Sequence, residues 1–157
     1  MSIWLYINIL LFITVLFSLD YQFVHLPIHI ILGLAGLFLI LFNWTRHAFF
    51  STIRNTPDRK KKIKLATISK RIYPFHRWVG TAALIVIILH AAIIIHQVGF
   101  LWTSMKMWSG IGAIIILVCM VLSGWLRLYF PSGRKRRAHI IFGFLLFLFV
   151  AIHTVLF

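Results

Sequence analysis

The chain has 157 residues, of which 62% are hydrophobic, and its mean hydropathy is +1.00. Soluble domains of this length are not so apolar, and the apolar segments leave no room for a soluble catalytic domain. Sixteen Lys and Arg residues against two acids give a formal net charge of +14. Because these charges fall at alternate boundaries of apolar segments, we expect membrane lipid as the partner and no nucleic-acid binding.

Five apolar stretches are long enough to cross a bilayer as helices, which takes about 20 residues each. The first is the shortest, but no basic residue precedes it and no small-residue cleavage site follows, so we interpret it as a span rather than a signal peptide. The sequence therefore predicts an all-α bundle of five transmembrane helices, forming a single domain over residues 1–157. The predicted spans are 3–19, 25–44, 77–97, 108–130 and 138–157.

Two clusters of basic residues predict the orientation of the bundle. One cluster is the basic loop 45–75 between the second and third spans, and the other runs from Arg127 to Arg137. The opposite boundaries of the spans carry few charges. The positive-inside rule then places the N-terminus and both clusters in the cytoplasm and the C-terminus outside, in the plasma or inner membrane of a cell.

The basic loop contains a helical pattern of its own. Thr56, Pro57 and Asp58 are typical of an N-cap, a proline at the first helical position and an acid in the first turn. Apolar residues then recur among lysines until Pro74, which ends the helix. We expect a short basic amphipathic helix on the cytoplasmic surface, which would bind anionic lipid, present a docking face to an acidic partner, or do both.

Two pairs of histidines share one spacing, because His76 and His90 lie fourteen residues apart, as do His139 and His153. Fourteen residues of α-helix rise about 21 Å and make nearly four full turns, so each helix carries two imidazoles on one face at two depths. Both helices are predicted to run outward, which gives an inner pair, His76 with His139, and an outer pair, His90 with His153. Facing pairs of this kind hold six-coordinate haem, so we predict two haem b groups with these four histidines as iron ligands.

Two glycines fit this hypothesis. Gly80 and Gly143 lie one helical turn beyond the leading histidine of each pair. A glycine at that place would let a flat macrocycle approach the backbone. The alternative is that the histidines are satisfied core residues and that the glycines merely allow the helices to pack.

Basic residues near the inner pair are candidate partners for haem propionates. These are Arg77 and Arg127, together with Lys70 and Arg71. Ordinary basic flanking of membrane spans is the alternative explanation. Near the outer pair, only Lys106 and a few neutral polar groups are available.

The remaining histidines and the single cysteine carry weaker signals. His25 and His29, one turn apart at the outer end of the second span, could bind a transition metal or lie near the electron exit, or else simply pack there. His96 could line a vestibule for substrate near the outer surface, and we expect His47 to be solvated in the basic loop. Cys119 excludes an intrachain disulfide and is expected to be a packing residue.

On these residues, the chain resembles the ferric reductase-like transmembrane domain family. That family includes ferric reductases, NADPH oxidases and the haem-binding subunit of the bacterial periplasmic methionine sulfoxide reductase system. The resemblance covers nearly the whole chain and implies two b-type haems, with electron transfer from the cytoplasmic to the outer side. The motifs that carry it are His76-Arg-Trp-Val-Gly80 with His90 on the third span, and His139-Ile-Ile-Phe-Gly143 with His153 on the fifth.

One departure from the family bears on the electron donor. Full-length oxidases and ferric reductases continue into a sixth span and a cytoplasmic flavin/nicotinamide domain, whereas this sequence stops four residues after His153. We therefore expect a small bacterial member that is an electron-transfer component of an oxidoreductase, without catalytic residues of its own. Its donor would be a separate flavoprotein, a quinol or another redox subunit at the cytoplasmic face, and its acceptor would lie outside.

Two other functions remain open. The chain could be a quinol-linked haem membrane anchor of a larger oxidoreductase. From a different class, it could be a haem-free membrane transporter or interaction protein. The spans contain no buried carboxylate and no pair of Gly/Pro-broken helices, which disfavours transport, and the doubled histidine spacing disfavours a plain interaction protein.

Overall fold

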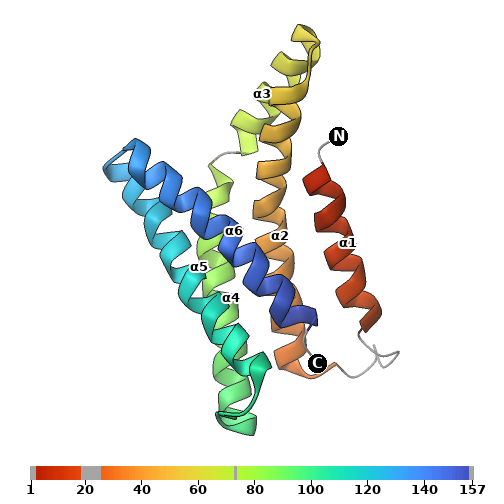
Figure 1. The fold of residues 1–157 in the computed structure, drawn as a ribbon, viewed down its shortest axis with the longest axis vertical. Helices are drawn as coiled ribbons and strands as arrows, with labels where there is room; N and C mark the ends of the chain where they lie inside the picture. The colour runs from red at the N-terminus through yellow and green to blue at the C-terminus, as the bar shows by residue number, and fades with distance from the viewer. Residues whose placement is uncertain (1–2, 19–25, 73, 156–157) are drawn as a thin grey trace.

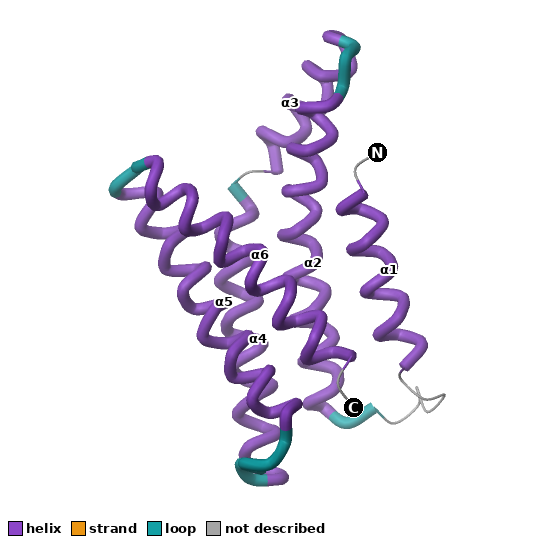
Figure 2. Tube along the Cα trace, viewed as in Figure 1, coloured by secondary structure: helices purple, strands orange, loops and turns teal. Residues whose placement is uncertain are grey.

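The computed structural model describes residues 3–18, 26–72 and 74–155, and all regular structure in these ranges is helical (Figure 1). Figure 2 shows that short loops join α2 to α3, α4 to α5 and α5 to α6. The helices are α1 (Ile3–Ser18), α2 (Ile28–Asn55), α3 (Arg59–Ile72), α4 (Phe75–Val98), α5 (Met105–Tyr129) and α6 (Gly133–Val155).

Four of these helices, α2, α4, α5 and α6, are long and apolar enough to cross a membrane. Helix α1 is also apolar, but it has only 16 residues. Large apolar side chains are exposed along these five helices, a surface that suits lipid rather than water. The chain is therefore an all-helical, multi-pass membrane protein. Four of the five predicted spans correspond to long apolar helices, and the first corresponds to the shorter α1.

The helix ends follow from residues that stop or cap helices. Pro74 precedes α4, which confirms that the helix before it cannot continue through this point. Gly99 ends α4 with a φ of 76°, a left-handed conformation that side chains disfavour, and its N–H donates to the Ile95 carbonyl over 2.9 Å. The Ser104 hydroxyl begins α5 by accepting from the N–H of Met107.

The predicted basic loop 45–75 is wrong in its first third, because residues 45–55 continue α2 as helix. No glycine or proline lies between Gly36 and Pro57, so nothing in the backbone ends the helix where the apolar stretch ends. Hydropathy locates the apolar part of a helix, whereas the helix itself stops at a residue that breaks it. Helix α2 therefore extends well beyond its apolar segment.

The predicted amphipathic helix is present as α3, but its predicted start is wrong by two residues. The Asp58 carboxylate accepts from the N–H groups of Lys60, at 2.8 Å, and Lys61, at 3.4 Å, so the cap is Asp58 rather than Thr56. The Thr56 hydroxyl instead donates to the carbonyl of Thr52 in the last turn of α2. The acid is thus used at the cap and not inside the first turn.

Two antiparallel helix pairs, α2 with α4 and α5 with α6, make the most extensive contacts in the bundle. Contacts between α4 and α5 join the pairs, α1 packs mainly on α2, and α3 folds back against α2 at one end (Figure 1). Small residues allow the close approach within each pair. A Cβ atom at Gly36 would overlap the side chain of Ile87, and one at Gly112 would overlap the ring of Phe149.

Replacing Gly36 with leucine should separate α2 from α4, because the new side chain has no space beside Ile87. Overpacking of this kind costs about 1–3 kcal/mol, so we expect a clearly lower thermal unfolding midpoint for Gly36→Leu in detergent. The matched control is Gly133→Leu, since a Cβ at Gly133 meets no atom within 4 Å. Equal midpoints for the two variants would show that α2 and α4 do not pack as described.

Candidate functional site

Two cavities lie one beyond the other inside the bundle of α2, α4, α5 and α6. The inner cavity lies nearer α3, has His76 and His139 in its wall, and has a volume of about 200 Å³. The outer cavity contains His90 and His153 and has about 110 Å³. The structure thus brings together the two histidine pairs that the sequence predicts. Three apolar residues line both cavities and form the partition between them: Ile40, Leu117 and Leu146.

The inner pair has the spacing of two axial ligands. The ring centroids of His76 and His139 lie 6.2 Å apart, and the ring planes are inclined by 77°. A metal ion bound between two imidazoles, with bonds of about 2 Å and roughly 1 Å from each nitrogen to its ring centre, separates the centroids by about 6 Å. The residues present therefore fit an iron held between them.

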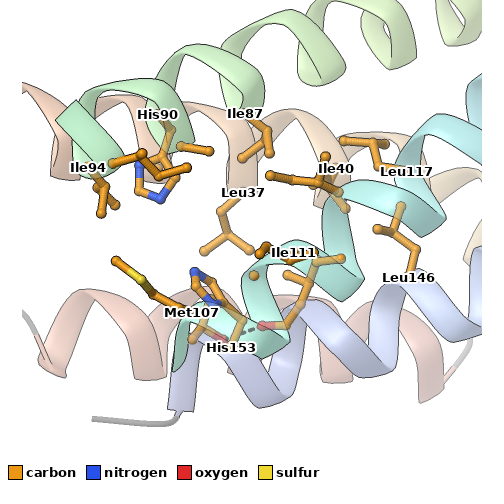
Figure 3. Close-up of a pocket in the computed structure, with 18 of the residues that line it drawn as sticks. Leu37, Ile40, Ile87, His90, Ile94, Met107, Ile111, Leu117, Leu146 and His153 are labelled. Carbon is orange, nitrogen blue, oxygen red and sulfur yellow. Dashed lines mark hydrogen bonds between the residues drawn. The ribbon is translucent and has the colours of Figure 1, made fainter. Parts of the chain in front are cut away.

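The outer pair lines the outer cavity from two different helices, as Figure 3 shows. His90 reaches into the outer cavity from α4, and His153 reaches toward it from α6 (Figure 3). Apart from these two rings and Thr154, the wall is formed by apolar side chains and glycines. The outer cavity therefore suits a flat apolar group that needs two nitrogen ligands and little else.

Backbone carbonyls fix the protonation of both outer histidines. The Nδ1 atom of His90 lies 2.6 Å from the carbonyl oxygen of His29, and Nδ1 of His153 lies 3.0 Å from that of Lys106. A carbonyl oxygen can only accept, so Nδ1 carries the proton in each ring. The lone pair of the neutral ring then lies on Nε2, the state in which imidazole binds a metal.

Serine hydroxyls on α5 support both histidines of α6. The Ser123 hydroxyl donates to the Met120 carbonyl over 2.9 Å, so its oxygen is left to accept from Nδ1 of His139, also at 2.9 Å. Ser109 is placed in the same way beside Nδ1 of His153, at 3.2 Å. Three of the four histidines thus present Nε2 as the unprotonated nitrogen.

A glycine on the neighbouring helix lies behind each of these three imidazoles. In an α-helix, the carbonyl four residues before a glycine accepts the glycine N–H. Because the glycine has no side chain, an imidazole from the neighbouring helix can also reach that carbonyl. A Cβ atom on the glycine would press against the Cε1 atom of the ring. The pairs are Gly33 with His90 at 3.0 Å, Gly110 with His153 at 2.9 Å and Gly124 with His139 at 3.3 Å.

These supporting residues were not predicted from the sequence, although α5 carries a signal for two of them. The dipeptide Ser-Gly occurs at 109–110 and again at 123–124, with the same fourteen-residue spacing as the histidines. Because α5 has no histidine of its own, this matching spacing indicates that α5 packs along a helix that carries two histidines fourteen residues apart. Gly33 has no such partner on α2 and could not be found in this way.

His76 is the exception among the four histidines. Its Nδ1 atom is buried and has no hydrogen-bond partner. Its backbone carbonyl accepts instead from the Asn43 side chain, over 3.2 Å. Among the described residues, no serine hydroxyl or glycine lies beside this ring as they do beside the other three.

Arginines line the inner cavity but not the outer cavity. Arg77 and Arg127 lie in its wall, where the sequence predicts them, whereas Lys70 and Arg71 do not. Arg46 also lies in the wall and was missed, because it was assigned to the flank of a loop rather than to a continuing helix. Guanidinium groups pair with carboxylates in a planar, two-bond geometry, so this end of the cavity suits an acidic ligand.

Unsatisfied polar atoms gather at the same place. The Nε1 atom of Trp44, the Nε atom of Arg77 and the Oδ1 atom of Asn43 are buried without a hydrogen-bond partner. All three residues line the inner cavity. Buried donors without partners are costly, and a ligand with carboxylate oxygens would satisfy the two N–H groups.

The two glycines singled out from the sequence both line the inner cavity. A Cβ at Gly80 would lie 3.3 Å from the Asn43 side-chain nitrogen, and one at Gly143 would lie 3.3 Å from Cε of Met120. Larger residues at either position would therefore reduce the space between the histidine helices.

The other predicted histidines are less informative. His25, and with it the predicted pairing with His29, lies outside the described residues, and Nδ1 of His29 is buried without a partner. His96 is exposed and lines neither cavity. The expectation that His47 is solvated in a loop is wrong. Because α2 continues through this position, the ring is half-buried, with its centroid 5.3 Å from that of Trp44.

Comparisons with protein-family models, with curated proteins and with solved structures found no match to this chain. Within the described ranges, no three or more His, Cys, Asp or Glu residues form a group able to hold a metal ion. A haem iron takes its other four ligands from the porphyrin and needs only two histidines from the protein. The case for a cofactor therefore depends on the geometry of the two cavities.

The hydrogen bonds to Nδ1 make a prediction that needs no cofactor. In the chain with ¹⁵N-labelled histidine in lipid bilayers, solid-state NMR should show His90, His139 and His153 as neutral rings protonated at Nδ1. Gly110→Ala should disturb the His153 signal, because the new methyl lies 2.9 Å from its ring, while Gly133→Ala should not. Protonation at Nε2 in all three rings would contradict the described hydrogen bonds.

Proposed function

We propose that the chain is a di-haem b-type transmembrane cytochrome of the ferric reductase-like kind, passing electrons from a cytoplasmic-side donor to an outer-side acceptor. The observation that carries this proposal is the arrangement of four histidines as two facing pairs in two stacked cavities, with 6.2 Å between the ring centroids of the inner pair. When bound, each haem supplies an iron centre that gains and loses one electron reversibly.

The protein's own contribution is to hold, orient and tune. His76 and His139 would ligate the inner haem, and His90 and His153 the outer haem. Hydrogen bonds to Nδ1 orient a ligating imidazole and raise its basicity. The partition between the cavities, formed by Ile40, Leu117 and Leu146, places only apolar side chains between the two sites.

The arginines of the inner cavity support the presence of acidic groups there. Arg46, Arg77 and Arg127 line the inner cavity, and the residues that line it include no aspartate or glutamate. Haem b brings two carboxylates, and the inner haem's propionates would pair with these guanidinium groups. The outer cavity has no arginine in its wall, so the propionates of the outer haem would extend toward the aqueous boundary near Lys106.

The proposed direction of transfer depends on the positive-inside rule. The basic residues of α3 and of the turn before α6 lie at the end of the bundle that holds the inner cavity. By this rule we infer that the inner cavity faces the cytoplasm, and that the chain has five spans with the N-terminus inside and the C-terminus outside. The donor would be a flavoprotein, a quinol or another redox subunit.

A quinol-linked membrane anchor is the second candidate function, and one observation favours it. A third cavity of about 90 Å³ shares Asn43, Arg46 and His76 with the inner cavity, and the rest of its wall comes from α2 and α3. Aromatic and polar side chains line it together, including Phe42, Phe49 and Ser69. Reduced-minus-oxidised spectra with a quinol as the only donor would distinguish a quinol-linked protein from one that needs a flavoprotein.

The purified chain should contain two haem b groups, seen as a Soret band and counted by the pyridine haemochrome assay. His76→Ala and His139→Ala should each remove the inner haem, and His90→Ala and His153→Ala the outer haem, leaving about one haem per chain. The matched control is His96→Ala, an exposed residue outside both cavities, which should keep both haems. The absence of a Soret band would refute the proposal.

Replacing Arg127 with leucine should weaken binding of the inner haem. Hydrogen bonds to charged groups contribute about 1.5–3 kcal/mol, which corresponds to a loss of roughly tenfold or more in affinity. Haem retention during competition with apomyoglobin would measure this loss. Arg134→Leu removes an exposed arginine that does not line the cavity and should leave retention unchanged, so equal losses in both variants would contradict the assignment.

A further inference from the structure

The four histidines occupy four equivalent positions in the bundle. A glycine on the neighbouring helix lies behind three of them, and the position of His76 differs. Gly33 on α2 faces His90 on α4. Helices α2 and α4 are antiparallel. Counting fourteen residues forward from Gly33 on α2 gives position 47, and counting fourteen residues back from His90 on α4 gives position 76. The fourth position should therefore carry a glycine at 47 behind His76, but it carries His47.

The side chain at position 47 has a physical consequence for His76. The His47 ring packs against Trp4, at 5.4 Å between centroids, and against Phe144, at 5.2 Å, so position 47 carries a Cβ and a ring where position 33 carries only hydrogen. The carbonyl of Asn43 lies four residues before position 47. It corresponds to the carbonyls of His29 and Lys106, which accept from His90 and His153. Nδ1 of His76 is accordingly buried without a partner.

An imidazole without this hydrogen bond is a weaker ligand. Removing the partner of a ligating histidine typically lowers metal affinity 10–100-fold, because the ring loses both orientation and basicity. The other three histidines all keep such a partner. His76 should therefore be the ligand most easily lost.

A second cavity adjoins the His76 ring. The ring lines the inner cavity and also the third cavity, between α2 and α3, where Thr45 and Ser69 offer polar groups. On the inner-cavity side, Gly80 and Ala83 leave little side-chain bulk along α4. The third cavity therefore offers the His76 ring a space outside the inner cavity.

We propose that His76 is an exchangeable ligand, so that the inner site accepts a small neutral molecule such as carbon monoxide on its α4 side while the outer site stays closed. This inference rests on the proposed function, because it requires a haem in the inner cavity. It adds a ligand-binding position at one of the two sites and names the residue whose departure opens it.

Carbon monoxide binding to the dithionite-reduced full-length chain in nanodiscs tests this proposal. About half of the haem absorbance should change to that of the carbon monoxide form, and the other half should not. A change in both haems, or in neither, would overturn the proposal. Two haems without carbon monoxide uptake would refute this inference alone, whereas the absence of haem would refute the proposed function as well.

Variants at position 47 identify the site that opens. His47→Gly should uncover the Asn43 carbonyl, restore a partner for Nδ1 of His76 and slow carbon monoxide binding at least tenfold. His47→Ala is the matched control, since it removes the same ring but keeps the Cβ, and it should bind carbon monoxide as fast as the parent chain. Equal rates in the two variants would overturn the proposal.

A second variant acts at the opposite end of the bundle and covers the case in which His47→Gly does not fold. Gly33→Ala places a methyl 3.0 Å from Cε1 of His90, which should displace the ring from the His29 carbonyl. The outer haem should then bind carbon monoxide as well, so that more than half of the absorbance changes. An unchanged fraction in folded, fully loaded Gly33→Ala would contradict the role given to the glycine positions.

Discussion

The contact between an imidazole N–H and a backbone carbonyl exposed beside a glycine is the interaction on which the site depends. It sets the protonation of the ring, leaves Nε2 free and fixes the ring against a neighbouring helix. It appears at His90 and at His153, and at His139 a serine hydroxyl acts as the acceptor. Helix packing and ligand chemistry are therefore determined by the same residues, because the glycine that allows close approach also exposes the acceptor.

The bundle consists of two helix pairs built on one plan. In each pair, a helix with small residues supports a helix with two histidines fourteen residues apart. The plan is complete in α5 and α6, where Ser-Gly dipeptides stand beside both rings. It is incomplete in α2 and α4, where His47 and Arg46 lie at the inner end. That difference separates a polar, arginine-lined cavity from an apolar one.

Much of the site could be predicted from the sequence, because a fixed spacing within one helix determines which side chains share its face. The pairing of His76 with His139 and of His90 with His153 follows from this spacing together with the parallel direction of the two helices. The supporting glycines could not be predicted, since contacts between helices depend on their relative register, which no single helix encodes. Arg46 and His47 were misplaced for another reason: hydropathy ends at the apolar stretch, whereas α2 continues to Asn55.

The partition of Ile40, Leu117 and Leu146 has an electrical consequence. Aliphatic side chains offer no hydrogen-bonded chain along which a proton could hop, whereas an electron can tunnel through them. Under the proposed function, each outward electron would then cross without a compensating proton, and transfer would be electrogenic. An interior-negative potential would drive this flow by about 2.3 kcal/mol per 100 mV, and sustained turnover would depolarise the membrane unless another carrier returned the charge.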